Sequence, residues 1–161
     1  AIHCGPTMMG IIGEKDRMQG DALSDNVNLA ARLEGLTKVY GASLLVSEET
    51  VNWLGHDHPF HLRFLGAAIV KGKRNVTGLY EVFDGDSPNE FDLKVSTHDA
   101  FEKAVRDYSA GQLAESRKGF SEVLDINPGD SCALYYLERL EEAEREGLGE
   151  QWDGVLRLTH K

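Results

Sequence analysis

The side chains in this sequence best suited to chemistry are an amide and a guanidinium placed four residues apart, Asn28 and Arg32. On a helix, residues at this spacing lie one above the other on the same face. An amide both donates and accepts hydrogen bonds, and a guanidinium binds phosphoryl oxygens through a planar fork of donors. The pair could bind a sugar and a phosphoryl group, although the same spacing also occurs on helix faces that only contact solvent.

A helix that presents this pair is predicted between residues 24 and 41. Ser24 and Asp25 are good N-cap residues, and Gly41 is a natural stop. Between them, apolar residues recur at helical spacing and predict a buried stripe: Leu29, Leu33, Leu36 and Tyr40. Asn28 and Arg32 then lie on a face beside that stripe.

Three blocks of sequence, in order, resemble the class III nucleotidyl cyclases. The first is Ile2-His3-Cys4-Gly5-Pro6, followed by two more glycines, and the third is Val70-Lys71-Gly72-Lys73 before residues 78–83. The second, residues 21–34, resembles the Gly-Asp-x-Val-Asn-x-Ala-x-Arg pattern of the family, with Ser24 at the place of the usual Gly. The resemblance covers residues 1–83, about half of the chain.

The resemblance implies a reaction in which the ribose 3′-oxygen attacks the α-phosphorus of the same nucleotide and expels pyrophosphate. Asn28 would orient the ribose, and Arg32 would stabilise the phosphoryl charge of the transition state. Lys71 would bind the polyphosphate. Asp21 would accept a hydrogen bond from the adenine amino group, because an ionised carboxylate only accepts hydrogen bonds.

Simpler interpretations remain for two of these residues. Asp21 follows Gly20 and is also typical of a turn, and the substitution at Ser24 weakens the match beside it. Lys71 begins the connection between predicted strands at residues 60–70 and 78–83, so it also fits a hairpin turn.

The resemblance also implies that part of the site comes from elsewhere. In the family a pair of Asp residues holds Mg²⁺ or Mn²⁺, and we expect those ligands upstream of this chain. The family site lies between two catalytic domains, so the partners expected are ATP and a second cyclase domain, in a homodimer. We therefore expect an adenylate cyclase that makes cyclic AMP when intact, and an inactive fragment when isolated. The alternative is a cyclase-like nucleotide-binding or dimerisation module without catalysis.

The predicted division is residues 1–86 for the C-terminal half of a cyclase domain, 87–96 for a linker and 97–161 for a helical region. Thr97 is expected to cap the first helix of that region, and Leu134, Leu137 and Leu140 are expected to point inward from the third. Eight residues resemble one tetratricopeptide unit: Ala104, Tyr108, Gly111, Leu113, Ser116, Phe120, Val123 and Pro128. This region could dock a protein partner or brace the cyclase half, and Trp152 is expected to anchor the tail on a neighbouring element.

The fold class predicted is α+β: a partial ferredoxin-like nucleotide cyclase sheet with an exposed edge, followed by a small α-helical appendage. The 161 residues carry a formal charge of −10, which disfavours nucleic acid as a partner. Cys4 and Cys132 fit no metal or redox spacing and indicate free thiols in the cytoplasm. No run is long and apolar enough to span a bilayer. Because the chain opens on Ala, we expect it to be the tail of a longer polypeptide, either cytoplasmic or the cytoplasmic part of a membrane-bound parent.

Overall fold

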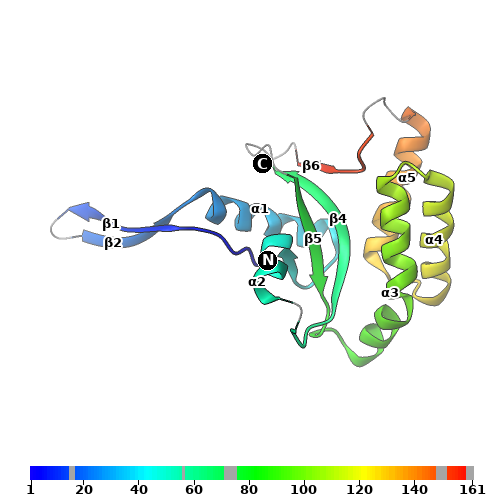
Figure 1. Cartoon of the computed structure of the whole chain (residues 1–161), viewed down its shortest axis with the longest axis horizontal. Coiled ribbons are helices and arrows are strands. Elements are labelled where there is room, and N and C mark those ends of the chain that lie inside the picture. The colour runs from blue at the N-terminus through cyan, green and yellow to red at the C-terminus, as the bar shows by residue number, and fades with distance from the viewer. Residues whose placement is uncertain (15–16, 56, 71–75, 148–151, 159–161) are drawn as a thin grey trace.

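The computed structural model describes residues 1–14, 17–55, 57–70, 76–147 and 152–158, and at residues 11–14, 17–23, 70 and 158 it describes the backbone alone. Helices and strands both contribute to its core, which confirms the predicted α+β class. Figure 1 shows α1 and α2 on one side of the central strands and α3, α4 and α5 on the other. No helix among the described residues is both long enough and apolar enough to cross a membrane.

The central sheet has the strand order β3-β5-β4-β6. Strand β5 (Val76–Val82) is antiparallel to both β3 (Leu45–Ser47) and β4 (Leu62–Val70). Strand β6 (Leu156–Leu158) is parallel to the end of β4. The β4–β5 hairpin confirms the pair of strands predicted around Lys71.

A second, two-stranded sheet extends away from the body of the molecule (Figure 1). It pairs β1 (Met8–Glu14) with β2 (Arg17–Leu23) in antiparallel register. Met8 and Met9 are largely exposed on it. This hairpin leads directly into the helix that carries Asn28 and Arg32.

Helix α1 (Asp25–Tyr40) forms as the sequence predicts. The Ser24 side chain accepts a hydrogen bond from the backbone N–H of Asn26 at 2.9 Å, and Gly41 ends the helix with φ = 65°. A positive φ of this kind favours glycine, which has no Cβ to clash. The apolar stripe is buried as predicted. Helix α2 (Glu48–Leu54) follows β3 and is capped by Ser47.

The predicted linker at residues 87–96 is helical instead. Helix α3 (Pro88–Ser109) begins directly after Ser87, which forms a capping box with Glu90. The Ser-Pro-Asn-Glu sequence suggests a turn, but a serine N-cap, a proline in the first turn and a glutamate three residues after the cap also start a helix. Thr97, the predicted cap, is buried inside α3, and its hydroxyl donates to the Leu93 carbonyl.

Helices α4 (Leu113–Ile126) and α5 (Ser131–Glu146) complete the helical region. The predicted inward face of α5 is partly wrong, because Leu134 is 45% exposed, although Leu140 is buried. The α5 residues that enter the core are Cys132, Ala133, Tyr136, Leu140 and Ala143. Stacking of the Tyr136 ring on Phe120 of α4 fixes this rotation of the helix, and the leucine spacing alone could not predict it.

The helical region shares one hydrophobic core with the sheet and α1. It also covers part of the edge that the sequence predicts to be exposed. Glu102 accepts a hydrogen bond from the Phe64 backbone N–H at 2.8 Å, and His98 donates to the Leu62 carbonyl. The other edge, at β3, is bridged by the backbone of Ile2. The resemblance of α3 and α4 to a tetratricopeptide unit stays a prediction.

Candidate active site

Helix α1 presents Asn28 and Arg32 together on its exposed side. Each precedes a buried leucine, Leu29 or Leu33, so the two polar side chains lie one turn apart beside the buried stripe. The pair predicted from spacing is therefore placed on one accessible face. Its catalytic role stays a prediction.

The N-terminal end of α1 is tied to the segment that opens the chain. The Asn26 side-chain amide donates to the Pro6 carbonyl at 2.6 Å, and the His3 ring nitrogen Nε2 lies 3.2 Å from Asn26 Oδ1. Because Oδ1 only accepts, Nε2 is the donor. Gly5 approaches so closely that a Cβ there would lie 2.4 Å from Asn26 Nδ2. The first turn of α1 therefore has a fixed place relative to residues 3–6.

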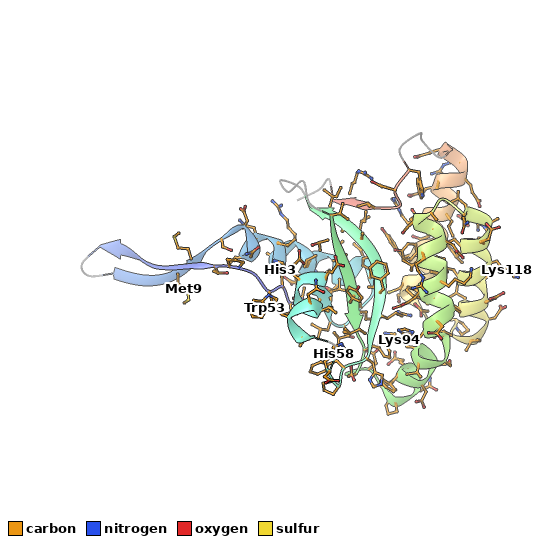
Figure 2. The ribbon with its side chains drawn as sticks, in the orientation of Figure 1. His3, Met9, Trp53, His58, Lys94 and Lys118 are labelled. Carbon is orange, nitrogen blue, oxygen red and sulfur yellow. The ribbon has the colours of Figure 1, made fainter. Side chains whose placement is uncertain are left out.

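His3 also links this turn to α2, and Figure 2 shows it near the base of the hairpin. Its other ring nitrogen, Nδ1, lies 2.8 Å from the Ser47 hydroxyl, which caps α2. The same nitrogen lies 3.7 Å from a carboxylate oxygen of Glu49. In the sequence, His3 stands out only as part of the first block that resembles the cyclases. The structure gives it a positional role that no local pattern signals.

The C-terminal end of α1 rests on the first turns of α5. The Tyr40 ring is buried and meets Tyr135 edge to face, with the centroids 5.1 Å apart. The Cys132 thiol donates to the Tyr40 carbonyl at 3.1 Å. Gly41 lies so close to α5 that a Cβ would be 2.5 Å from Cβ of Ser131.

A buried group of charged side chains joins the sheet to α3 and α5. Arg63 of β4 donates to Glu81 of β5 at 2.6 Å and to Asp130, the N-cap of α5, at 2.5 Å. Lys94 of α3, labelled in Figure 2, bonds both Glu81 and Asp86. We call these five residues the buried ion cluster. Arg63 and Asp130 are in contact although 67 residues separate them in the sequence. No sequence motif therefore reveals the buried ion cluster.

Burial and neighbouring charges shift the pKa of Arg63 in this cluster and of the adjacent Cys132. Burial alone lowers the pKa of Arg63, but the surrounding anionic groups, with Glu81 and Asp130 in direct contact, raise it overall, so the guanidinium stays charged. Burial raises the pKa of the Cys132 thiol. That thiol is therefore neutral and unreactive, and both cysteines are free, as the sequence predicts.

The other two predicted site residues cannot be placed against this pair. Asp21 lies in β2 with its backbone opposite Gly10, in a stretch where side chains are not described. Lys71 lies outside the described residues. A polar cavity of about 470 Å³ lies beside the buried ion cluster, and neither Asn28 nor Arg32 lines it. The Asn28 and Arg32 face is therefore an accessible surface away from that cavity.

The described residues do not provide a metal site. Among them, no group of three or more His, Cys, Asp or Glu side chains is arranged to hold a metal ion. The pair of metal-binding Asp residues implied by the resemblance is expected upstream of this chain.

The first half of the chain matches a family of known proteins. The family model described as "Adenylate and Guanylate cyclase catalytic domain" matches residues 1–82, half of the chain. The chain belongs to this family.

Three relatives of this chain are named adenylate cyclases. "Adenylate cyclase, terminal-differentiation specific" of Dictyostelium discoideum is 32% identical over 139 residues, covering 86% of this chain and 6% of the relative. "Adenylate cyclase" of Anabaena cylindrica is 40% identical over 50% of this chain and 16% of the relative. "Adenylate cyclase 1" of Rhizobium meliloti (strain 1021) is 42% identical over 50% of this chain and 12% of the relative. The chain thus spans less than a fifth of the length of each of these relatives.

Proposed function

We propose that this chain is part of an adenylate cyclase that converts ATP to cyclic AMP and pyrophosphate. The observation that carries this proposal is the pairing of Asn28 and Arg32, one turn apart on the exposed face of α1, within the residues that match the cyclase family. ATP is proposed over GTP for two reasons. The three relatives are named adenylate cyclases, and the family resemblance assigns Asp21 to the adenine amino group.

Each proposed role follows from the chemistry of its side chain. Arg32 would donate to phosphoryl oxygens whose negative charge grows in the transition state, so its binding is strongest there and lowers the barrier. Asn28 would hold the ribose through its amide, so that the 3′-oxygen faces the α-phosphorus. Lys71 would bind the departing pyrophosphate as a point charge.

We infer that the rest of the site comes from outside this chain. Mg²⁺ or Mn²⁺ and a second cyclase domain are proposed to complete it, in a homodimer. Because the resemblance places the metal ligands upstream of this chain, we propose that the isolated chain is inactive and that the longer cyclase is active.

The test measures cyclic nucleotide production from ATP and from GTP with Mn²⁺, in the longer cyclase that contains this chain and in the chain alone. We expect product from the longer protein only, and mainly from ATP. Arg32→Ala should lower turnover by about 10²-fold or more, because it removes a charge partner of the transition state. Lys38→Ala removes an exposed cation from the same helix and is the matched control, expected to leave turnover unchanged.

Two results would contradict the proposal. Normal turnover in Arg32→Ala would show that Arg32 on α1 does not stabilise the transition state. Binding of nucleotide to the longer protein without any turnover would favour the alternative, a cyclase-like nucleotide-binding module.

A further inference from the structure

The C-terminal end of α1 is held by a helix from outside the residues that match the cyclase family. The holding contacts come from the first turns of α5, at Ser131, Cys132 and Tyr135. We propose that α3, α4 and α5 brace α1 and so position Arg32 for catalysis. This inference rests on the proposed function and adds Tyr135 and Cys132 as positioning residues, which act through α1 rather than on the substrate.

The helix α1 can transmit a displacement from one end to the other. Tyr40 follows Arg32 by eight residues, which is about 12 Å along an α-helix. Between them, Leu33 and Leu36 are fully buried, so this segment packs as a rigid element. A shift of the Tyr40 end would therefore also move or tilt Arg32. Misplacement of a catalytic group by about 1 Å can cost up to 10²-fold in rate.

Helix α5 is itself fixed to the sheet, which makes it able to act as a brace. Asp130, its N-cap, bonds the buried Arg63 of β4. Further along α5, the Tyr136 hydroxyl donates a hydrogen bond to the Leu65 carbonyl, which is also in β4. These anchors flank Tyr135, the residue whose ring meets Tyr40. Contacts therefore connect β4 to α5, and α5 to the C-terminal end of α1.

The sequence similarity to one adenylate cyclase reaches beyond the family match and into the helical region, as a brace formed by α3, α4 and α5 would require. The alignment with the Dictyostelium discoideum relative covers 139 residues of this chain, whereas the family model matches only residues 1–82. The similarity must therefore extend into the helical region. Similarity in the helical region is expected if α3, α4 and α5 brace the catalytic helix, and it is not expected if they form an unrelated appendage.

The test compares two adjacent residues of α5 in the longer cyclase. Tyr135 is half-buried against α1, whereas Leu134 is exposed and serves as the matched control. We expect Tyr135→Ala to lower kcat on the order of 10-fold while KM for ATP changes less than about 3-fold. Leu134→Ala should change neither constant. Tyr135→Phe keeps the ring that meets Tyr40 and should restore kcat.

A second readout uses the 161-residue chain and needs no activity. Amide hydrogen exchange in the last turn of α1, residues 36–40, should be faster in Tyr135→Ala than in Leu134→Ala, and the exchange of α2 should stay the same in both. This pattern separates a loosened helix end from general unfolding, which would accelerate exchange throughout.

The outcomes distinguish the two proposals. If Arg32→Ala is fully active, the proposed function is wrong. If Arg32→Ala is inactive but Tyr135→Ala matches Leu134→Ala in kcat and in exchange, the proposed function stands and the brace is overturned. A Tyr135→Phe variant as impaired as Tyr135→Ala would also overturn it, because the ring contact would then not be the cause.

Discussion

The two ends of α1 are held by different kinds of interaction. At the N-terminal end, near Asn28, the contacts are hydrogen bonds among polar side chains of short segments, made by His3, Asn26 and Ser47. At the C-terminal end, the Tyr40 ring packs against Tyr135 of α5, and the Tyr40 carbonyl accepts a hydrogen bond from the buried Cys132 thiol. Helix α5 is in turn anchored by the buried ion cluster.

This difference has an energetic consequence. Individual hydrogen bonds contribute on the order of 1 kcal/mol each, because water competes for the same groups. Leaving a buried charge without its partner costs several times more. We therefore expect the C-terminal end of α1 to set the stability of the fold, and the N-terminal end to adjust locally.

The largest effect is expected where the buried ion cluster loses a member. Asp130→Asn keeps a side chain that can cap α5 but leaves Arg63 without one of its two carboxylates. We expect a loss of about 3–5 kcal/mol in the free energy of unfolding, measured by urea denaturation. Asp125→Asn, an exposed carboxylate on α4, is the control and should change stability by less than about 0.5 kcal/mol. Equal stability of the two variants would contradict the contrast between the two ends.

An intermediate effect is expected at Gly41. Gly41→Ala forces a Cβ into the left-handed region and within 2.5 Å of Ser131 Cβ, so we expect a loss of about 2 kcal/mol. Adding Ser131→Gly should recover part of it, because the clash disappears while the backbone strain stays. Gly35→Ala on the same helix has open space around it and should instead stabilise by about 0.5–1 kcal/mol. A double variant no more stable than Gly41→Ala would show that α1 and α5 are not in contact there.

The smallest effect is expected at the N-terminal end, and it depends on pH. Burial opposes ionisation of Glu49, but the hydrogen bond from the Thr77 hydroxyl and further donors lower the pKa of Glu49 overall, below its ordinary 4.5. A lowered folded-state pKa stabilises the fold above the unfolded-state pKa, and this contribution is lost as the pH falls through the folded-state pKa.

Glu49→Gln should therefore be less stable than the unmodified chain at pH 7, by less than about 1 kcal/mol because the side chain is 46% exposed. The difference should shrink as the pH falls below about 4.5. Urea unfolding at a series of pH values measures it, with Glu141→Gln on the exposed side of α5 as the charge control. If the stability difference between Glu49→Gln and the unmodified chain grew as the pH fell, the pKa of Glu49 would be raised in the folded state, not lowered.

The parts of the fold that local chemistry determines could be predicted from the sequence. Ser24 and Gly41 bound α1 because a cap and a left-handed stop depend on neighbouring backbone groups only. The burial of Leu29, Leu33, Leu36 and Tyr40 followed from helical periodicity. The same periodicity placed Asn28 and Arg32 on one face, although it cannot state what they bind.

The parts that depend on distant residues could not be predicted. The buried ion cluster and the Tyr40–Tyr135 contact join segments that are far apart in the sequence. The start of α3 is a different case, because Ser87 offered a local helix signal that we interpreted as a linker. The role of His3 at the start of α1 could not be predicted, because its partners, Asn26 and Ser47, are 23 and 44 residues away. Side-chain chemistry identifies what a residue can do, and only the tertiary structure shows which partner it meets.

The pairing of Arg63 with Asp130 also has a consequence for the order in which the chain folds. A ribosome delivers β4 and β5 well before α5, and during that interval Arg63 lacks one of its two carboxylate partners. Domains generally fold as units during synthesis, and contacts between distant segments form late. We therefore expect nascent chains that end before Asp130 to remain sensitive to protease, and protection to appear only when α5 has emerged.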